Sequence, residues 1–240
     1  MVSCVGRPVI DKQILLVQLA DQHPDVKRFF PSEYGTDIEY GPSSAKEPPH
    51  QLKIKVRAAI RETKNLDHTF VVTGPYGDAD PGLFLSAAAE GKEEGGTFDV
   101  KRKKAVLLGD GEGKISLTTM RDVGRFVVAA LLHPDAASRK ALKVNSFTAT
   151  TKEIVGEFER QTGTQWDVDF TSLARLKELE KEYLAKGDPR MGGFTLRRIW
   201  TEGGTLYEGR DNGIIGLEDG EVDSLESCVR QAIEVQKAAS

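Results

Sequence analysis

Most of the fold prediction rests on the stretch Val26-Lys27-Arg28-Phe29-Phe30-Pro31-Ser32-Glu33-Tyr34-Gly35. Its first five residues are typical of a short buried strand, and Pro31 ends that strand because proline offers no amide hydrogen to a sheet. The small, polar and aromatic residues that follow therefore stand at the carboxyl end of the strand. Open sheets of parallel strands bind ligands at this end. On residue types alone, residues 31–35 form either a ligand-binding loop or a structural turn, and the turn is favoured.

Segments on both sides of this stretch predict an alternation of strands and helices. Before it, Val2-Ser-Cys-Val-Gly6 predicts a short buried strand, and apolar residues at helical spacing follow over residues 10–23. After it, residues 45–63 predict an amphipathic helix and residues 68–73 a third strand. Strands separated by helices are typical of βαβ crossovers, and the hairpin turns of an antiparallel domain are not found here. We therefore predict an α/β fold with a parallel sheet.

The pattern is looser beyond Pro75. The run Gly109-Asp-Gly-Glu-Gly113 lies between predicted strands at residues 105–108 and 115–119. Its spacing differs from the Gly-x-Gly-x-x-Gly of dinucleotide-binding loops and it leads into a strand, so we predict a hairpin turn. The other expected elements are a strand at 143–147 and helices at 78–91, 122–132, 151–162 (capped by Thr150), 173–186 and 222–238.

The composition is that of an ordinary globular protein. The 240 residues hold 33 Lys+Arg and 37 Asp+Glu, a net charge of −4, which argues against nucleic acid as the main partner. We interpret the basic run Lys101-Arg102-Lys103-Lys104 as a solvated turn. Cys4 and Cys228 have no motif partner and the four histidines lack metal-ligand spacing, so we expect no disulfide and no metal. Without an apolar run of membrane-spanning length or a signal peptide, we expect a cytoplasmic protein with no membrane association.

Three cations on the predicted helix at 45–63 are candidates for chemistry. Lys53 and Arg57 are four residues apart and share one helix face, whereas Lys55 points elsewhere. A lysine that faces a cleft can transfer a proton or hold a ribose hydroxyl, because its pKa falls readily on burial. Most such lysines are solvated, and spacing alone does not single out Lys53. We expect Asp122, in the first turn of its helix, to have a structural role.

Together these residues resemble the NmrA-like, isoflavone-reductase-like branch of the atypical short-chain dehydrogenases, and the fungal members look closest. The matching motifs, in the same order, are Val2-Ser-Cys-Val-Gly6, Gln13, residues 26–35 and Lys53-x-x-Val56-Arg57. The resemblance is sharp from Met1 to about His133 and looser beyond. His50 departs from the family, which usually has an aromatic residue at this position.

The resemblance implies a Rossmann-like domain that binds NADPH, formed by residues 1–74 and 105–148, and a smaller substrate lobe formed by residues 75–104 and 149–240. It implies an NADPH-dependent reductase of a small aromatic or secondary-metabolite substrate. Lys53 corresponds to the catalytic lysine, which assists proton delivery and orders the nicotinamide ribose while the cofactor supplies a hydride. The implied cofactor-binding residues are Val5, Gly6, Pro31, Ser32, Glu33, Lys53, Thr73, Pro75 and Tyr76.

The glycine-rich turn that follows the first strand in this family is absent from the sequence, which begins at what resembles strand 4. At roughly 30 residues per βαβ unit, the part of the family fold that precedes strand 4, about 75 residues, has no counterpart in this sequence. We then expect the strand at Val2-Ser-Cys-Val-Gly6 to be a bare sheet edge. Either a second copy covers this edge in a homodimer, or the cofactor site is half-built.

Three functions from different classes follow. The first is the reductase, which the presence of Lys53 favours. The second is a dinucleotide-sensing regulator of the NmrA type that binds cofactor without turnover, because fold does not decide between the two. The third is a truncated fragment with an incomplete cofactor site. We favour the reductase.

Overall fold

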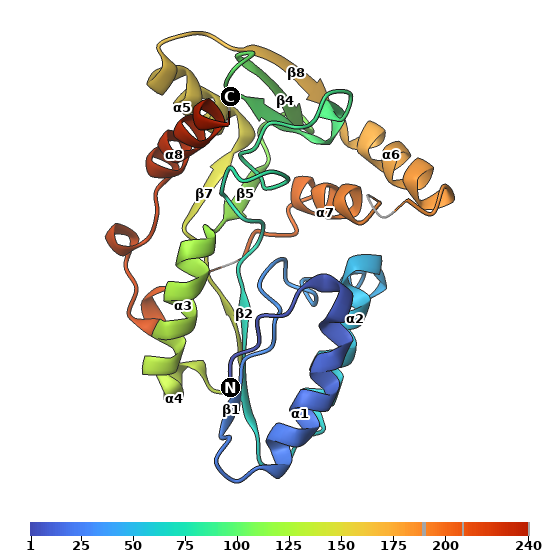
Figure 1. The fold of residues 1–240 in the computed structure, drawn as a ribbon, viewed down its shortest axis with the longest axis vertical. Helices are drawn as coiled ribbons and strands as arrows, with labels where there is room; N and C mark the ends of the chain where they lie inside the picture. Colours follow the sequence, from blue (N-terminus) through green and yellow to red (C-terminus); the bar gives the residue numbers. More distant parts are fainter. Residues whose placement is uncertain (189–190, 208, 240) are drawn as a thin grey trace. The chain divides into compact units, whose positions relative to one another are not determined.

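The computed structural model describes residues 1–188, 191–207 and 209–239, which form two compact units (Figure 1). Unit 1 comprises Met1–Thr73, Val123–Val144 and Tyr207–Glu218, and unit 2 comprises the rest. The α/β class is confirmed. The predicted division of the chain differs from these units: residues 105–122 pack in unit 2, and Tyr207–Glu218 packs in unit 1 rather than with the C-terminal segments.

A parallel sheet organises unit 1. Its strand order is β1 (Arg28–Phe29), β2 (Asp67–Val72), β6 (Lys140–Lys143), and both pairings are parallel. The N-terminal segment adds one parallel bridge, between Val2 and Phe30. The strand expected at Val2-Ser-Cys-Val-Gly6 is thus shortened to its first residues, because the chain turns at Gly6 into a 3-10 helix, η1 (Arg7–Lys12).

Helices cover both faces of this sheet. Figure 1 shows α1 (Gln13–Gln22) and α2 (Gln51–Arg61) on one side of β2, and α3 (Met120–Leu132) on the other. The short α4 (Pro134–Ala137) follows α3. The predicted helix at 45–63 begins only at Gln51, because prolines precede it and the chain there forms the 3-10 turns η2 (Ser44–Lys46) and η3 (Pro48–His50). The core between α1, α2 and the sheet contains Ile10, Val17, Ala20, Phe29, Val56, Ile60, Leu66 and Phe70.

Unit 2 combines parallel and antiparallel pairing. β4 (Lys104–Leu108) pairs antiparallel with β3 (Thr97–Asp99) and parallel with β8 (Asp167–Thr171), and β5 (Lys114–Leu117) pairs antiparallel with β7 (Phe147–Thr150). Its helices are α5 (Thr151–Thr162), α6 (Leu173–Ala185), α7 (Met191–Thr201) and α8 (Leu225–Ala238). The remaining 3-10 turns are η4 (Glu93–Gly95) and η6 (Asp219–Glu221) in this unit and η5 (Gly213–Ile215) in unit 1. None of the helices in the described residues is both long and apolar enough to cross a membrane.

Several predicted elements in this part of the chain were wrong. The strands at 105–108 and 115–119 do not form a hairpin, because β4 pairs with β3 and β8 while β5 pairs with β7. The helix expected at 78–91 is a series of turns, interrupted by Gly82 with a φ of 89° after Pro81. The strand expected at 143–147 is split between the end of β6 and the start of β7. α7 was not among the predicted elements.

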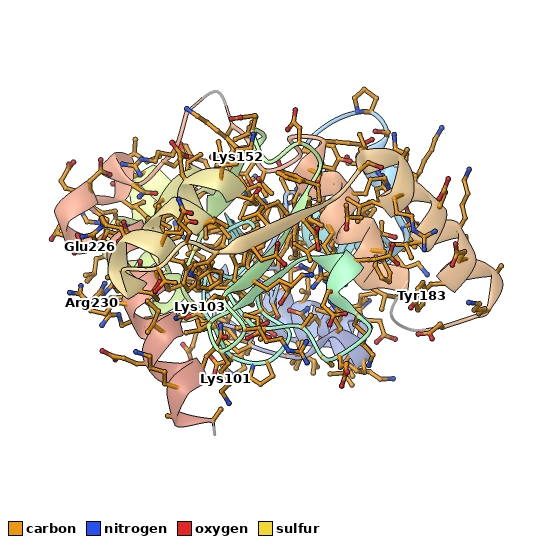
Figure 2. All side chains as sticks on the ribbon, turned by 90° about the horizontal axis from the view of Figure 1, so that it is seen from above. Lys101, Lys103, Lys152, Tyr183, Glu226 and Arg230 are labelled. Atoms are coloured by element: carbon orange, nitrogen blue, oxygen red, sulfur yellow. The ribbon has the colours of Figure 1, made fainter. Side chains whose placement is uncertain are left out.

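Other local predictions were right. α5 begins at the expected capping box, in which Thr150 Oγ1 accepts from the Glu153 amide and the Glu153 carboxylate accepts from the Thr150 amide. The first three residues of the basic run at 101–104 form a turn between β3 and β4, with Lys101 exposed (Figure 2), and Lys104 begins β4. Lys103 in the same turn places its ammonium 5.8 Å from the Trp166 ring centroid.

Asp122 has the structural role that its position in the first turn of α3 indicated. It is fully buried, and its Oδ2 accepts hydrogen bonds from Ser146 Oγ at 2.5 Å and from the Asp223 amide at 2.7 Å. Its own amide donates to Thr119 Oγ1, which in turn donates to Asp223 Oδ2. These bonds hold together three segments of unit 2 that are distant in sequence.

Replacing Asp122 by alanine should leave two buried donors unpaired. We expect the free energy of unfolding to fall by roughly 2–4 kcal/mol, because each unpaired buried donor costs about 1–3 kcal/mol. Urea denaturation measures the loss. The matched control is Asp135→Ala, since Asp135 is exposed at the start of α4, and equal losses for the two variants would contradict this role for Asp122.

Candidate active site

The candidate site lies in unit 1, where the chain leaves the carboxyl ends of β1 and β2. The loop at residues 31–35 follows β1, and Thr73 follows β2. The Thr73 amide donates to the Gly35 carbonyl at 3.0 Å, which attaches the loop to the end of the neighbouring strand. This is the edge at which open parallel sheets bind ligands.

Ser32 connects this loop to the N-terminal segment. Its hydroxyl donates to the Val5 carbonyl at 2.8 Å, and its amide donates to Oε1 of the buried Gln13 at 2.7 Å. The structure thus brings together Val5 and Ser32, both implied cofactor residues. Pro31 is buried beside them, whereas Gly6 is exposed at the start of η1.

Glu33 and Arg57 form a buried ion pair behind the loop. Their side chains are 3% and 1% exposed, and Arg57 Nε donates to Glu33 Oε1 at 2.6 Å. Burial raises the pKa of Glu33 to about 7, against the lowering effect of the Arg57 and Lys53 charges. Among the described residues, Glu33 Oε2 and Arg57 Nη2 have no hydrogen-bond partner. The pair therefore leaves an acceptor and a donor unused inside the protein.

Further carboxylates surround the guanidinium of Arg57. Arg57 Nη1 donates to Glu39 Oε2 and lies 3.7 Å from Asp37 Oδ1, and the guanidinium carbon lies 4.4 Å from the centroid of the Phe70 ring. Arg61, one turn further along α2, also binds Glu39 through two hydrogen bonds. Arg57 thus joins α2, the loop after β1 and the sheet.

Lys53 lies one turn before Arg57 on α2 and faces the same loop. Its Nζ donates to the Glu33 carbonyl oxygen at 3.0 Å and packs against Gly35, where a Cβ would come within 3.4 Å of it. The side chain is partly exposed, and in the described part of the chain Nζ has no second hydrogen-bond acceptor. Because an ammonium has three N–H groups, two remain for a ligand.

The surroundings of Lys53 make it a better acid than an ordinary lysine. Burial lowers its pKa to about 8, opposed by the Glu33 charge and reinforced by the Arg7 and Arg57 charges. A group with such a pKa can give up and regain a proton near neutral pH. Lys55, two residues on, is exposed on another face of the helix.

His50, at the end of η3, lies on the same side of α2 as Lys53. Its ring is buried, with Nδ1 at 2.9 Å from the Ser44 carbonyl and Nε2 without a partner among the described residues. Burial lowers the pKa of His50, and the Lys53 charge lowers it further, against the Ser44 bond. A neutral ring that donates from Nδ1 leaves Nε2 as an acceptor.

The remaining implied cofactor residues divide between the two units. Thr73 is buried at the end of β2 in unit 1, while Pro75 and Tyr76 belong to unit 2, where Tyr76 forms a parallel bridge with Thr118. Their role beside a cofactor stays a prediction.

Sequence reasoning missed the burial of Arg57 and two of its acidic partners, Asp37 and Glu39. The spacing of Lys53 and Arg57 on one helix face was visible, but an arginine on an α/β helix is usually solvated. The missing signal was burial: Arg57 falls between Val56 and Ile60 on the apolar stripe of α2. Asp37 and Glu39 stand in an irregular loop whose path no periodicity predicts.

Comparisons with known proteins agree on a family. The sequence profile of the NmrA-like family matches residues 2–186. The oxidoreductase aprR of Aspergillus flavus is 30% identical over 190 residues, which are 78% of this chain and 60% of that protein. The phenylcoumaran benzylic ether reductase PT1 of Pinus taeda is 30% identical over 165 residues, 67% of this chain and 50% of that protein. The chain therefore spans between half and three fifths of the length of these curated relatives.

Among solved structures, the binary complex of leucoanthocyanidin reductase with NADPH from Vitis vinifera is similar, with a TM-score of 0.75. The match covers 97% of this chain and 74% of that chain at 18% identity. At this identity the likeness bears on the fold alone, and it confirms the predicted Rossmann-like architecture.

Replacing Arg57 by methionine should leave the buried Glu33 carboxylate without its partner. We expect the free energy of unfolding to fall by about 3–5 kcal/mol at about pH 8, the typical cost of breaking a buried ion pair. Without Arg57, the Glu33 pKa should rise above its parent value of about 7, so the folded variant keeps a proton that the unfolded chain releases. The loss of stability should therefore grow as the pH rises above about 7. Urea denaturation at several pH values measures both effects.

The control for this variant is Arg61→Met, which removes an exposed partner of Glu39 and should cost less than about 1 kcal/mol at any of these pH values. A double variant, Arg57→Met with Glu33→Gln, should recover part of the loss. A loss that is the same for Arg57→Met and Arg61→Met, or independent of pH, would contradict the ion pair's role.

Proposed function

Because the chain belongs to the NmrA-like family and carries a poised lysine at the carboxyl ends of β1 and β2, we propose that it is an NADPH-dependent reductase of a small aromatic substrate. The predicted resemblance to this family is confirmed by the profile match over residues 2–186. The observation that carries the proposal is the Lys53 ammonium, which is partly exposed, has a lowered pKa and, among the described residues, bonds only the Glu33 carbonyl.

The residues around Lys53 fit the nicotinamide ribose end of a dinucleotide. A ribose hydroxyl needs a donor and an acceptor at one place, and the site offers two unused N–H groups on Lys53 together with main-chain groups of the loop at 31–35. Gly35 leaves the space beside Nζ open. We propose that Val5, Gly6, Pro31, Ser32, Glu33, Thr73, Pro75 and Tyr76 also border the cofactor. The 240 residues contain no Gly-x-x-Gly-x-x-Gly run for the pyrophosphate.

When bound, NADPH would supply the hydride. Reduction of a polar double bond or opening of a benzylic ether also needs one proton. Lys53 would hold this proton on Nζ and release it to the substrate, and its neutral amine would regain a proton from solvent. The Glu33 carbonyl fixes the position of Nζ, and the Glu33–Arg57 pair fixes Glu33. Small aromatic substrates are proposed here because related proteins carry names such as phenylcoumaran benzylic ether reductase.

Binding of NADPH to the full 240-residue chain tests the cofactor assignment. Replacing Lys53 by methionine should weaken NADPH binding by about tenfold or more, because a hydrogen bond from a charged group contributes about 1.5–3 kcal/mol. Isothermal titration calorimetry measures the dissociation constant. The matched control is Lys55→Met on the same helix, which should bind NADPH as the parent does.

No binding of NADPH by the parent chain, or equal affinity of the Lys53→Met and Lys55→Met variants, would overturn the assignment. Binding without any turnover of aromatic ethers, enones or ketones would favour the dinucleotide-sensing regulator instead.

The rate of NADPH oxidation should depend on the protonation of Lys53. Its pKa of about 8 means that the ammonium form is lost as the pH rises through about 8, so the rate should fall there. With a phenylcoumaran as substrate, the fall should persist in Lys55→Met. In a Lys53→Arg variant that retains activity, the fall should disappear, since a guanidinium stays protonated. A pH profile unchanged by Lys53→Arg would remove Lys53 from proton delivery.

A further inference from the structure

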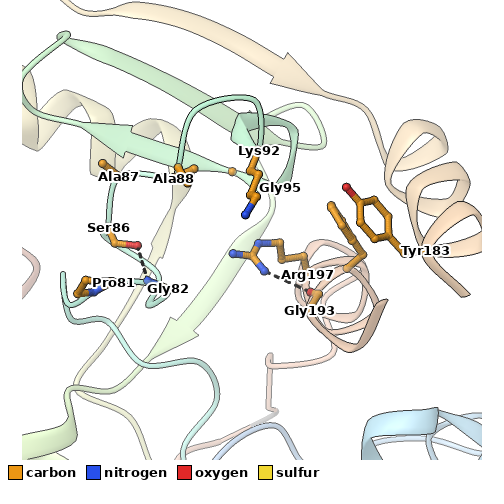
Figure 3. A pocket seen from close by; sticks show the side chains of 13 residues that line it. Pro81, Gly82, Ser86, Ala87, Ala88, Lys92, Gly95, Tyr183, Gly193 and Arg197 are labelled. Atoms are coloured by element: carbon orange, nitrogen blue, oxygen red, sulfur yellow. Dashed lines mark hydrogen bonds between the residues drawn. The ribbon is translucent and has the colours of Figure 1, made fainter. Parts of the chain in front are cut away.

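A cavity of about 550 Å³ lies within unit 2, apart from the residues discussed so far (Figure 3). Its walls come from residues 81–96, which precede and include η4, and from α6 and α7. Small side chains such as Ala87 and Ala88 form one wall, and the aromatic rings of Tyr183 and Phe194 form another. The two ring centroids are 4.7 Å apart. A space of this size and lining holds a small organic molecule.

Two cations, Arg197 and Lys92, stand in this mostly apolar lining. Figure 3 shows the guanidinium of Arg197 reaching from α7 into the cavity. Its hydrogen bond within the described residues is a long one, from Nη1 to the Gly193 carbonyl at 3.4 Å. Gly95 faces the guanidinium, and a Cβ there would lie 3.6 Å from Arg197 Nε, so small residues leave this face of the group open.

The described part of the chain provides no carboxylate partner for Arg197. Burial lowers the pKa of Arg197, and no acidic neighbour offsets this effect. The acids of the surrounding helices are engaged elsewhere: Glu180 binds Arg198 at 2.6 Å, and Glu94 binds Arg175 at 2.9 Å. An arginine stays charged inside a protein, and a buried charge without a partner is unfavourable.

A ligand anion would relieve this cost. We propose that the cavity binds a small aromatic carboxylate, with the carboxylate on Arg197 and the ring between the aromatic and alanine walls. A guanidinium matches a planar carboxylate through two parallel hydrogen bonds, and Arg197 has Nε and Nη donors unused by the described residues. Lys92, which also borders the cavity (Figure 3), adds a second positive charge.

An aromatic acid is favoured over inorganic phosphate by the rest of the lining. The apolar walls at Tyr183, Phe194, Ala87 and Ala88 have little to offer a small hydrated dianion, whereas an aromatic body would cover apolar surface there. All the lining residues belong to unit 2, so this ligand would bind whether or not NADPH binds at Lys53.

The test is calorimetric titration of the full chain, without NADPH, with cinnamate and with its uncharged analogue cinnamyl alcohol. We expect cinnamate to bind the parent and the Arg197→Met variant to weaken this binding by about tenfold or more, as for loss of a charge-assisted hydrogen bond. Binding of cinnamyl alcohol should be weaker and unaffected by the substitution. Circular dichroism verifies that the variant is folded.

The matched control is Arg230→Met, because Arg230 is exposed on α8 (Figure 2) and should not alter cinnamate binding. A second variant, Ala88→Leu, fills part of the cavity while keeping Arg197 and should also weaken cinnamate. The proposal is overturned if the parent does not bind cinnamate, if acid and alcohol bind alike, or if Arg197→Met behaves as Arg230→Met does.

Discussion

The candidate active site depends on one buried ion pair, between Glu33 of the loop after β1 and Arg57 of α2. Both side chains are almost fully removed from water, so neither charge is tolerable without the other. The pair fixes the distance between α2 and the carboxyl end of β1, and Asp37 and Glu39 extend the same attachment along the loop. Stacking of the guanidinium on Phe70 adds the sheet to this arrangement.

The properties of Lys53 follow from this ion pair. Its Nζ is held by the main-chain carbonyl of Glu33, the residue that Arg57 already fixes, so the ammonium has a defined position without a carboxylate of its own. A direct bond to a carboxylate would raise the pKa of a lysine and occupy its donors. Here burial lowers the pKa, and donors stay available. The same pair that stabilises the loop thus also holds Nζ in place while its donors stay available.

Sequence alone was sufficient where the deciding signals are local. The strand before Pro31, the crossover helix carrying Lys53 and the capping box at Thr150 and Glu153 all depend on neighbouring residues, and the structure contains them. Pairing between distant strands has no such signal, which is why a hairpin was expected between β4 and β5. Asp37 and Glu39, two partners of Arg57, were missed for the same reason, since they lie on an irregular loop. No helix was predicted at α7 because its glycines have a low helix propensity, which tertiary packing overrides in the structure.

Arg57 and Arg197 show how surroundings distinguish a structural arginine from one available to a ligand. Arg57 faces the carboxylates of Glu33, Asp37 and Glu39 and a ring beneath it, so its charge is compensated within the chain. Arg197 has one long bond to a carbonyl, a glycine beside it and a cavity before it. Since the described chain surrounds the Arg57 guanidinium with carboxylates and gives Arg197 none, stability alone does not account for Arg197. An anion from outside the chain would compensate the charge of Arg197, as we propose.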